Sequence, residues 1–323
     1  MKIFVTRKIP EPGLKLLRKE HEIVVFAHDR IPTKKEIING LKGKNGLLCL
    51  LSDPIDKDVI KSEPNLKMIA NYAVGYDNID LRAATEKRIP VSNTPGVLTD
   101  TTAEMAWAQL FSVARRIVEG DKYTRAGKFK GWGPMLMLGQ DVSNKTLGVI
   151  GAGRIGTAFA LKSKGFNMKV LYLDGRVNKT LEKELKAKKV ELNELIKKSD
   201  YISIHVPLTK ETYHLINKEE LKVMKRNAIL INTSRGPVVD EDALVKALKE
   251  KWIFGAGLDV YEHEPKVAEE LKKLDNVVLQ PHSASATFET RSKMAIIAAE
   301  NMIAGLNGQI PPNCVNPEIF EKK

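Results

Sequence analysis

This sequence of 323 residues lacks low-complexity tracts, long apolar runs and more than a few cysteines. Its two cysteines, Cys49 and Cys314, are too few for a disulfide framework or a structural zinc site. No apolar run approaches the ~20 residues that a membrane span needs. The first residues, Met1 to Val5, lead straight into a strand-like segment and lack the apolar region of a signal peptide. We therefore expect a cytoplasmic protein with no membrane association and no metal site.

The formal net charge of +12 raises the question of a nucleic-acid partner. The lysines are scattered along helical stretches such as 181–189 and 245–251, where they are mixed with glutamates. No basic block is interleaved with aromatic residues, and no nucleic-acid-binding motif is present. We interpret the charge as a solvated lysine-rich surface without a nucleic-acid partner, whose field favours anionic substrates.

Two regions of the chain alternate strand-like and helical patterns, which predicts parallel sheets covered by helices on both faces. In the first region the expected strands are Ile3–Thr6, Glu22–Phe26, Gly46–Leu51, Lys67–Asn71 and Pro90–Asn93. In the second they are Thr146–Ile150, Lys169–Leu173, Tyr201–Val206, Ala228–Asn232, Gly257–Val260 and Val277–Leu279. At this length, two domains are expected.

Two long helices are expected outside this alternation. The run from Asp100 to Glu119 is apolar on most sides, which predicts a buried helix, often one that packs against another subunit. The run from Thr287 to Leu306 is amphipathic and ends at Gly308.

A glycine-rich motif directly follows the predicted strand at 146–150. It reads Gly151-Ala152-Gly153-Arg154-Ile155-Gly156. Such a G-x-G-x-x-G is a weak signal alone, but between a strand and a helix it is typical of dinucleotide binding. The first glycine makes the tight turn, the second admits the pyrophosphate and the third allows close packing of helix on strand. The helix N-terminus then holds the phosphates.

An acidic residue is expected about twenty residues later, at the end of the next strand. Asp174 stands there, directly after the strand at 169–173. A carboxylate at this point binds the ribose 2′-OH of NAD and repels the 2′-phosphate of NADP. Arg176, two residues on, is placed to meet that phosphate. The sequence thus favours NAD and leaves NADP open.

Candidate chemical residues lie where ligands bind such sheets, at the carboxyl ends of strands. Arg235 follows the strand at 228–232, and its guanidinium matches a substrate carboxylate. His282 and His205 both follow strands, and a histidine at either position suits a general acid or base. Position alone does not choose between the two histidines. The other histidines, His21, His28, His214 and His263, are interpreted as surface residues.

Three carboxylates follow the strand at 257–260: Asp259, Glu262 and Glu264. Any one of them, paired with the histidine, would orient the imidazole ring and favour its charged form. Periodicity does not choose among the three.

The sequence resembles the D-isomer-specific 2-hydroxyacid dehydrogenases over nearly its whole length, most of all the glyoxylate/hydroxypyruvate reductases. The stretches that carry the resemblance are 73–80, 93–104, 148–156, 232–236, 257–265 and 281–287. The resemblance implies that Arg235, Glu264 and His282 are the catalytic set. Arg235 would bind the substrate carboxylate, His282 would protonate the keto oxygen as hydride arrives at C2, and Glu264 would keep His282 charged.

The resemblance also implies the binding residues. The implied cofactor contacts are Thr102, Gly151, Ala152, Gly153, Arg154, Ile155, Gly156, Asp174, Gly175, Arg176, His205, Val206, Pro207, Thr233, Ser234, Arg235, Asp259, His282 and Ala284. The implied substrate contacts are Leu51, Val74, Gly75, Trp132, Arg235 and His282. Two departures from the family pattern stand out. Ser283-Ala284 follows the histidine where relatives often have Ile-Gly or Ile-Ala, and Asp174-Gly175 replaces the Ser/Thr and Arg of some glyoxylate reductases.

The implied fold is α/β, with two doubly wound parallel-sheet domains. A flavodoxin-like substrate domain, residues 1–95 plus 287–323, would be split around an inserted Rossmann NAD-binding domain, residues 96–286. The helix at 100–119 would lie at the interface of a homodimer. The expected function is NAD(P)H-dependent reduction of glyoxylate or hydroxypyruvate to the 2-hydroxy acid. The alternatives are the same chemistry on D-lactate, a branched 2-hydroxy acid or 3-phosphoglycerate, and an NAD-sensing binding protein without turnover.

Overall fold

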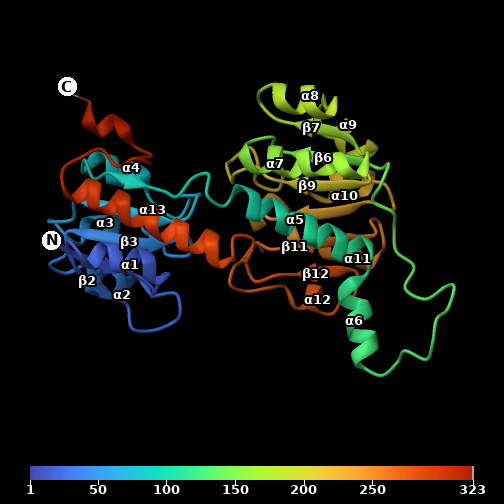
Figure 1. Ribbon diagram of the computed structural model, residues 1–323, viewed down its shortest axis with the longest axis horizontal. Helices are drawn as coiled ribbons and strands as arrows, with labels where there is room; N and C mark the ends of the chain where they lie inside the picture. The colour runs from blue at the N-terminus through green and yellow to red at the C-terminus, as the bar shows by residue number, and fades with distance from the viewer. Residues whose placement is uncertain (322–323) are drawn as a thin grey trace. The chain divides into compact units, whose positions relative to one another are not determined.

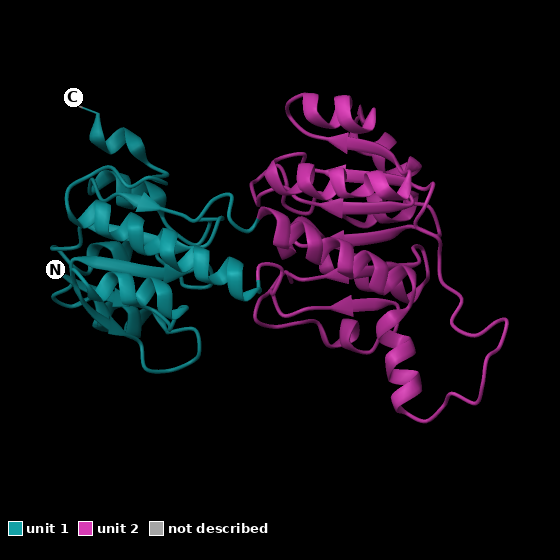
Figure 2. Cartoon of the chain, in the orientation of Figure 1, with its two compact units in different colours: residues 1–98, 286–323 teal, residues 99–285 magenta. Residues whose placement is uncertain are grey.

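The computed structural model describes residues 1–321, and its chain divides into two compact units (Figure 2). The first unit comprises Met1–Leu98 and Ala286–Lys323, and the second comprises Thr99–Ser285. Each unit has its own parallel sheet (Figure 1).

The first unit has, within the described residues, a five-stranded sheet in the order β2-β1-β3-β4-β5. Its strands are β1 (Lys2–Val5), β2 (Glu22–Val25), β3 (Gly46–Leu50), β4 (Met68–Tyr72) and β5 (Val91–Ser92). Its helices are α1 (Glu11–Arg18), α2 (Lys34–Leu41), α3 (Lys57–Lys61), α4 (Leu81–Glu86) and α13 (Phe288–Leu306), followed by the 3₁₀ turn Pro317–Phe320. All the strand pairs are parallel, and the order is that of a flavodoxin-like sheet.

Apolar residues on both faces of these strands explain the layers of the first unit. Successive strand residues point to opposite faces, so Ile3 and Val5 pack in one cluster with α1 and α13, while Phe4 packs in the other with α2, α3 and α4. The helix α13, from the far end of the chain, lies against α1 and β4 (Figure 1). The C-terminal segment therefore completes the core of the first unit.

The second unit has, within the described residues, a seven-stranded sheet in the order β12-β11-β10-β9-β6-β7-β8. Its strands are β6 (Thr146–Ile150), β7 (Lys169–Leu173), β8 (Lys188–Lys189), β9 (Tyr201–Ile204), β10 (Ile229–Asn232), β11 (Gly255–Leu258) and β12 (Val277–Leu279). Its helices are α5 (Thr99–Ala114), α6 (Ile117–Arg125), α7 (Arg154–Lys162), α8 (Lys179–Leu185), α9 (Leu192–Lys198), α10 (Lys218–Val223), α11 (Glu241–Lys249) and α12 (Glu269–Lys272), with 3₁₀ turns at Ser163–Phe166 and Gly236–Val238.

The same alternation builds two helix layers on this sheet. Ile229 and Ile231 pack in one cluster with α5 and α7, whereas Leu230 packs in the other with α9, α10 and α11. The chain runs from β6 to β7 on one side and later returns to β9 on the other, so the strand order reverses next to β6. Ligands of open α/β sheets bind at such a switch point, and the glycine-rich motif begins there. The predicted fold class is confirmed.

The long helix expected at 100–119 is interrupted, so that expectation was wrong in its length. α5 ends at Ala114, Arg116 has a left-handed backbone with φ of 52°, and α6 starts at Ile117. The carbonyl oxygen of Ala114 accepts a hydrogen bond from the backbone N–H of Gln140 (2.8 Å). This long-range partner replaces the next helical hydrogen bond and ends α5.

The apolar character of α5 has an explanation inside the second unit. The helix lies against α7, β10 and β11 and buries Ala106, Trp107 and Leu110 there. Trp107 stacks on Phe159 of α7 with ring centroids 4.9 Å apart. The burial that the sequence attributed to another subunit is therefore largely supplied by the same chain. Among residues 1–321, no helix is long and apolar enough to cross a membrane.

Candidate active site

The glycine-rich turn after β6 has the backbone that the motif predicts. Gly151 has a φ of +92°, a conformation that suits glycine, and its N–H donates to the carbonyl oxygen of Leu173 (2.8 Å). A Cβ at Gly156 would lie 1.9 Å from the carbonyl oxygen of Gly151, so only glycine allows α7 to pack this close to the turn. A Cβ at Gly153 would meet nothing within 4 Å. The space next to the turn is thus open at the second glycine and closed at the third.

The N-terminus of α7 faces this open space. Gly153 is its N-cap, and no side chain caps the helix there. Uncapped backbone N–H groups at a helix N-terminus bind phosphate, and the helix dipole adds to the attraction. The turn and the helix therefore fit the pyrophosphate of a dinucleotide, with Ala152, Arg154 and Ile155 as neighbours.

Asp174 lies at the end of β7 and connects that strand to the glycine-rich turn. One carboxylate oxygen accepts the N–H of Ala152 (2.8 Å), and the other accepts the N–H of Arg176 (3.0 Å). Gly175 and Arg176 are exposed beside it. The carboxylate of Asp174 therefore lies directly beside the glycine-rich turn.

The turn after β10 lies at the same edge of the sheet. Asn232 holds it, because its side-chain oxygen accepts the N–H and the hydroxyl of Ser234 and its amide donates to the carbonyl oxygen of Arg235. The hydroxyl of Thr233 is buried and has no hydrogen-bond partner within residues 1–321. An orphaned buried hydroxyl in this turn fits a bound polar group, as expected for the nicotinamide side of the cofactor.

His205 follows β9, and its surroundings distinguish it from His282. Burial lowers the pKa of His205 to about 3. Its Nε2 atom lies 2.9 Å from the hydroxyl of Ser203, and its ring lies 5.0 Å from that of Phe159. Because the ring stays neutral at ordinary pH, His205 is poorly suited to donate a proton. This fits the expected place of His205, Val206 and Pro207 in the wall of the cofactor site.

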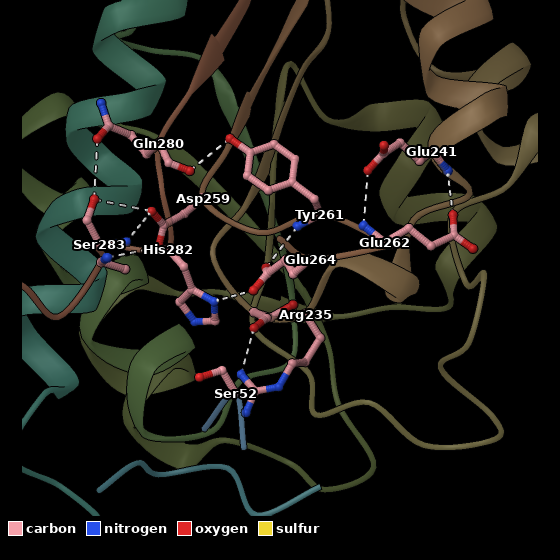
Figure 3. Close-up of polar contacts among 12 residues, drawn as sticks. Ser52, Arg235, Glu241, Asp259, Tyr261, Glu262, Glu264, Gln280, His282 and Ser283 are labelled. Carbon is pink, nitrogen blue, oxygen red and sulfur yellow. Dashed lines mark hydrogen bonds and ion pairs between the residues drawn. The ribbon is translucent and has the colours of Figure 1, made fainter. Parts of the chain in front are cut away.

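His282 and Glu264 form a pair at the ends of two neighbouring strands (Figure 3). The Nδ1 atom of His282 lies 2.9 Å from one carboxylate oxygen of Glu264, whose other oxygen accepts the N–H of Tyr261 (3.0 Å). Burial acts to raise the pKa of Glu264, but the hydrogen bond and charge of His282 outweigh it and hold that pKa below its usual value. The carboxylate is thus ionised and orients the imidazole.

The backbone at His282 is unusual. Its φ is +54°, in the left-handed region that non-glycine residues seldom adopt. The N–H of His282 donates to the carbonyl oxygen of Asp259, and the next two N–H groups, of Ser283 and Ala284, donate to the Asp259 carboxylate (2.7 and 2.8 Å). The strain is therefore compensated by a buried carboxylate, an arrangement that is common at functional sites.

The three candidate carboxylates thus have three different partners. Glu264 pairs with His282, Glu262 pairs with His214, and Asp259 binds the backbone after His282. Burial raises the pKa of Asp259, although the two N–H groups of Ser283 and Ala284 partly oppose the change. Asp259 is fully buried, so its carboxylate supports the loop. The interpretation of His214 as a surface residue missed its contact with Glu262, which periodicity gave no reason to expect.

Arg235 follows the Asn232 turn and is half-buried. One of its guanidinium nitrogens donates to the carbonyl oxygen of Ser234 (2.9 Å), and its charge helps to lower the pKa of Glu264. Figure 3 shows its side chain on the same side of the loop as Glu264 and His282. The second unit therefore gathers a cation, an anion and an imidazole at one edge of its sheet.

The remaining predicted substrate residues lie elsewhere in the chain. Leu51 directly follows β3, and Val74 and Gly75 lie in the loop after β4, all in the first unit. That loop is fixed by two hydrogen bonds. The side-chain amide of Asn93 donates to the carbonyl oxygen of Val74, and that of Asn71 donates to the carbonyl oxygen of Gly75. Trp132 lies in the segment after α6 and is 86% exposed. Thr102 is buried near the start of α5. In the part of the chain that is described, no cluster of three or more His, Cys, Asp or Glu residues has metal-binding geometry.

A Rossmann sheet with a phosphate-binding turn and a histidine–carboxylate pair at one edge is the arrangement of a nicotinamide-dependent dehydrogenase. The profile of the family described as "D-isomer specific 2-hydroxyacid dehydrogenase, NAD binding domain" matches residues 107–284. The chain therefore belongs to the D-isomer-specific 2-hydroxyacid dehydrogenase family, as its sequence motifs predict.

Individual relatives match the chain over nearly its whole length. A glyoxylate reductase of Korarchaeum cryptofilum is 54% identical over 99% of this chain and 97% of its own. A glyoxylate reductase of Thermococcus litoralis is 52% identical over 99% of this chain and 98% of its own. Among solved structures, an NADPH-dependent glyoxylate/hydroxypyruvate reductase of Sinorhizobium meliloti, in complex with NADP and malonate, matches with a TM-score of 0.88. It is 30% identical, with 100% of this chain and 98% of that chain covered.

Proposed function

We propose that this protein reduces glyoxylate or hydroxypyruvate to the corresponding 2-hydroxy acid with NADH. The observation that carries the proposal is the 2.9 Å contact between His282 and the ionised Glu264, with the charge of Arg235 close to the same carboxylate. Relatives about half identical over their full length are named glyoxylate reductases, which supports the choice of a small 2-oxo acid.

Each member of the catalytic set has a role that follows from its chemistry. Arg235 binds the substrate carboxylate through its planar guanidinium and stabilises the charge that develops on the keto oxygen. Glu264 orients the imidazole and favours its protonated form, so that His282 donates a proton to that oxygen. The bound nicotinamide supplies the hydride that reduces C2. The oxidative direction reverses these roles, with His282 accepting the proton.

The cofactor preference rests on Asp174. Its carboxylate stands between Ala152 and Arg176 at the expected ribose position, and this negative charge favours NADH over NADPH. One solved relative is named as an NADPH-dependent reductase and another was solved in complex with NADPH, which is why both cofactors belong in the test. The contacts of Leu51, Val74, Gly75 and Trp132 with substrate stay predictions from the family resemblance.

A homodimer is part of the proposal. The segment formed by α6 and residues 127–140 exposes several large apolar side chains: Ile117, Phe129, Trp132, Met135 and Leu138. Apolar side chains gathered on one segment are typical of protein–protein interfaces. Light scattering coupled to gel filtration would then give twice the chain mass of 36.0 kDa. The expectation of a cytoplasmic enzyme, without a nucleic-acid partner, completes the proposal.

The test is a set of initial rates with NADH and with NADPH on glyoxylate, hydroxypyruvate, pyruvate and phosphohydroxypyruvate. We expect the highest kcat/KM with NADH on glyoxylate or hydroxypyruvate, and loss of that rate in His282→Asn purified in parallel. A preference for pyruvate, a branched 2-oxo acid or phosphohydroxypyruvate would keep the reaction type and replace the substrate. Absence of turnover with all of them, despite tight NADH binding, would instead favour an NAD-sensing protein.

A further inference from the structure

The loop after β11 carries Glu264 and is held by a second set of acidic contacts, on the far side of Tyr261 (Figure 3). The N–H of Glu262 donates to a carboxylate oxygen of Glu241 (3.0 Å), and the N–H of Glu241 donates to a carboxylate oxygen of Glu262 (3.1 Å). The second oxygen of Glu241 accepts the N–H of Ala268 (3.3 Å). The two glutamates therefore bind each other's backbone reciprocally and tie the loop to the start of α11.

His214 adds a third contact to this arrangement. Its Nε2 atom lies 2.7 Å from the carboxylate oxygen of Glu262 that does not accept the N–H of Glu241. The backbone N–H of His214 donates to the carbonyl oxygen of Pro237 (2.8 Å). Burial acts to raise the pKa of Glu262, but hydrogen bonds from Glu241 and His214 hold that pKa below its usual value. Both oxygens of the Glu262 carboxylate are thus engaged while it stays ionised.

These contacts are coupled to Glu264 through the short segment between them. Glu262 and Glu264 are two residues apart, and the N–H of Tyr261 donates to Glu264 while its hydroxyl donates to the carbonyl oxygen of Gln280 (2.8 Å). The backbone of Tyr261 packs against Gly236, where a Cβ would lie 1.9 Å from its carbonyl carbon. The backbone on one side of Glu264 is therefore fixed, and a shift of Glu262 has to move it.

We propose that Glu262, bound reciprocally to Glu241 and to His214, is a positioning residue that fixes the loop carrying Glu264 and so sets the Glu264–His282 contact. This inference rests on the proposed function. The carboxylate of Glu262 contacts neither member of that pair, so it acts through the loop. The titratable groups near Glu262 are His214, Glu241 and His263, and the other charged or titratable groups near the Glu264–His282 pair are Asp259 and Arg235.

The test compares Glu262→Ala with the conservative Glu262→Gln in the whole enzyme. We expect Glu262→Ala to lower kcat for reduction by about 10- to 100-fold, because small misplacements at an active site have effects of this size. The alkaline decline of kcat should begin at lower pH, since the imidazolium loses part of its carboxylate support. KM for NADH should stay unchanged. Glu262→Gln, whose amide oxygen still accepts one N–H, should restore most of the rate.

A matched control separates positioning from loss of stability. Asp200 directly precedes β9, at the edge of the sheet away from the active site. Like Glu262, it is a mostly buried carboxylate with two partners: it accepts the backbone N–H of Thr146 and pairs with Lys225. Asp200→Asn should lower the thermal midpoint without moving the kcat–pH profile. If Glu262→Ala also lowers the midpoint and leaves the profile of the wild type in place, the proposal is wrong.

Two further variants keep the outcome clear. If Glu262→Ala does not fold, Glu241→Ala removes the other half of the reciprocal contact and should give the same shift of the profile. An unshifted profile in that variant would equally overturn the inference. Glu264→Gln tests the proposed function separately, because wild-type turnover in that variant would show that the assignment of Glu264 to the catalytic set is wrong. A large loss in Glu264→Gln with no change in Glu262→Ala would overturn only the positioning role.

Discussion

The Nδ1 atom of His282 lies 2.9 Å from the Glu264 carboxylate although eighteen positions separate the two residues in the chain. Glu264 belongs to the loop after β11 and His282 follows β12, which is the parallel neighbour of β11. Parallel strands bring their carboxyl ends to one edge, so this contact is a consequence of the strand order. With Nδ1 engaged by Glu264, Nε2 is the ring nitrogen through which His282 would donate a proton to a ligand.

Replacement of Glu264 by Gln tests the electrostatic part of this pair. The amide keeps the size of the side chain and one acceptor but removes the charge that favours the imidazolium. We expect kcat for 2-oxo acid reduction to fall by about 100-fold or more, within the range that a positioned acid contributes. The alkaline decline in rate should move to lower pH. Steady-state rates between pH 5 and 10 would show this, and a lower rate with an unshifted profile would contradict it.

Arg235 should be sensitive even to a change that keeps its charge. In Arg235→Ala, we expect a higher KM for the 2-oxo acid and a kcat lower by about 100- to 1,000-fold, since one stabilising donor of a developing oxyanion has this value. Arg235→Lys should recover only part of the loss, because an ammonium lacks the planar pair of donors. Arg82→Lys, at a side chain that is 89% exposed, is the matched control. If Arg235→Lys had the kcat and KM of the wild type, two-point binding of the substrate by the guanidinium would be excluded.

Much of the fold could be predicted because its signals are local. The strand at 146–150, the glycines that follow it and Asp174 lie within thirty residues, and each has a direct steric or electrostatic reason for its identity. The helix at 100–119 was predicted less well. Its break at Arg116 depends on a hydrogen bond from Gln140, a contact that helical periodicity does not contain.

The site shows the same division. Residue type and strand ends identified Arg235, two histidines and three carboxylates, but the pairing of those groups was open until the family resemblance indicated Glu264. The structure separates them by partner: Glu264 with His282, Glu262 with His214, and Asp259 with backbone N–H groups. These partners come from different elements, so their contacts depend on tertiary packing and leave no periodic signal in the sequence.

The low pKa of His205, about 3, predicts an effect of acid on stability. Unfolded histidine has a pKa of about 6.5, so the unfolded state binds one more proton than the folded state between these values. The free energy of unfolding should therefore decrease as pH falls from about 6.5 towards 3, by at most about 1.4 kcal/mol per pH unit from this side chain. His205→Gln should remove that slope. Urea unfolding of both proteins at several pH values measures it, and a difference that is constant with pH would contradict the assignment.

Asp174→Asn tests the cofactor preference with little change of structure. The amide oxygen still accepts the N–H of Ala152, so the glycine-rich turn should keep its shape while the negative charge is lost. We expect kcat/KM for NADH to fall by about 10- to 100-fold, the value of a hydrogen bond to a charged group, and kcat/KM for NADPH to rise. The ratio of the two, measured on one 2-oxo acid, is the readout.

Arg176 decides how the rise with NADPH is interpreted. In the Asp174→Asn background, Arg176→Ala should reduce the use of NADPH and leave that of NADH in place, because only NADPH presents a 2′-phosphate to the guanidinium. If Arg176→Ala lowers kcat/KM equally for NADH and NADPH, the arginine supports the turn after β7 and does not bind the 2′-phosphate. If the wild type already prefers NADPH, Arg176 outweighs Asp174, and the preference for NADH drawn from that carboxylate is wrong.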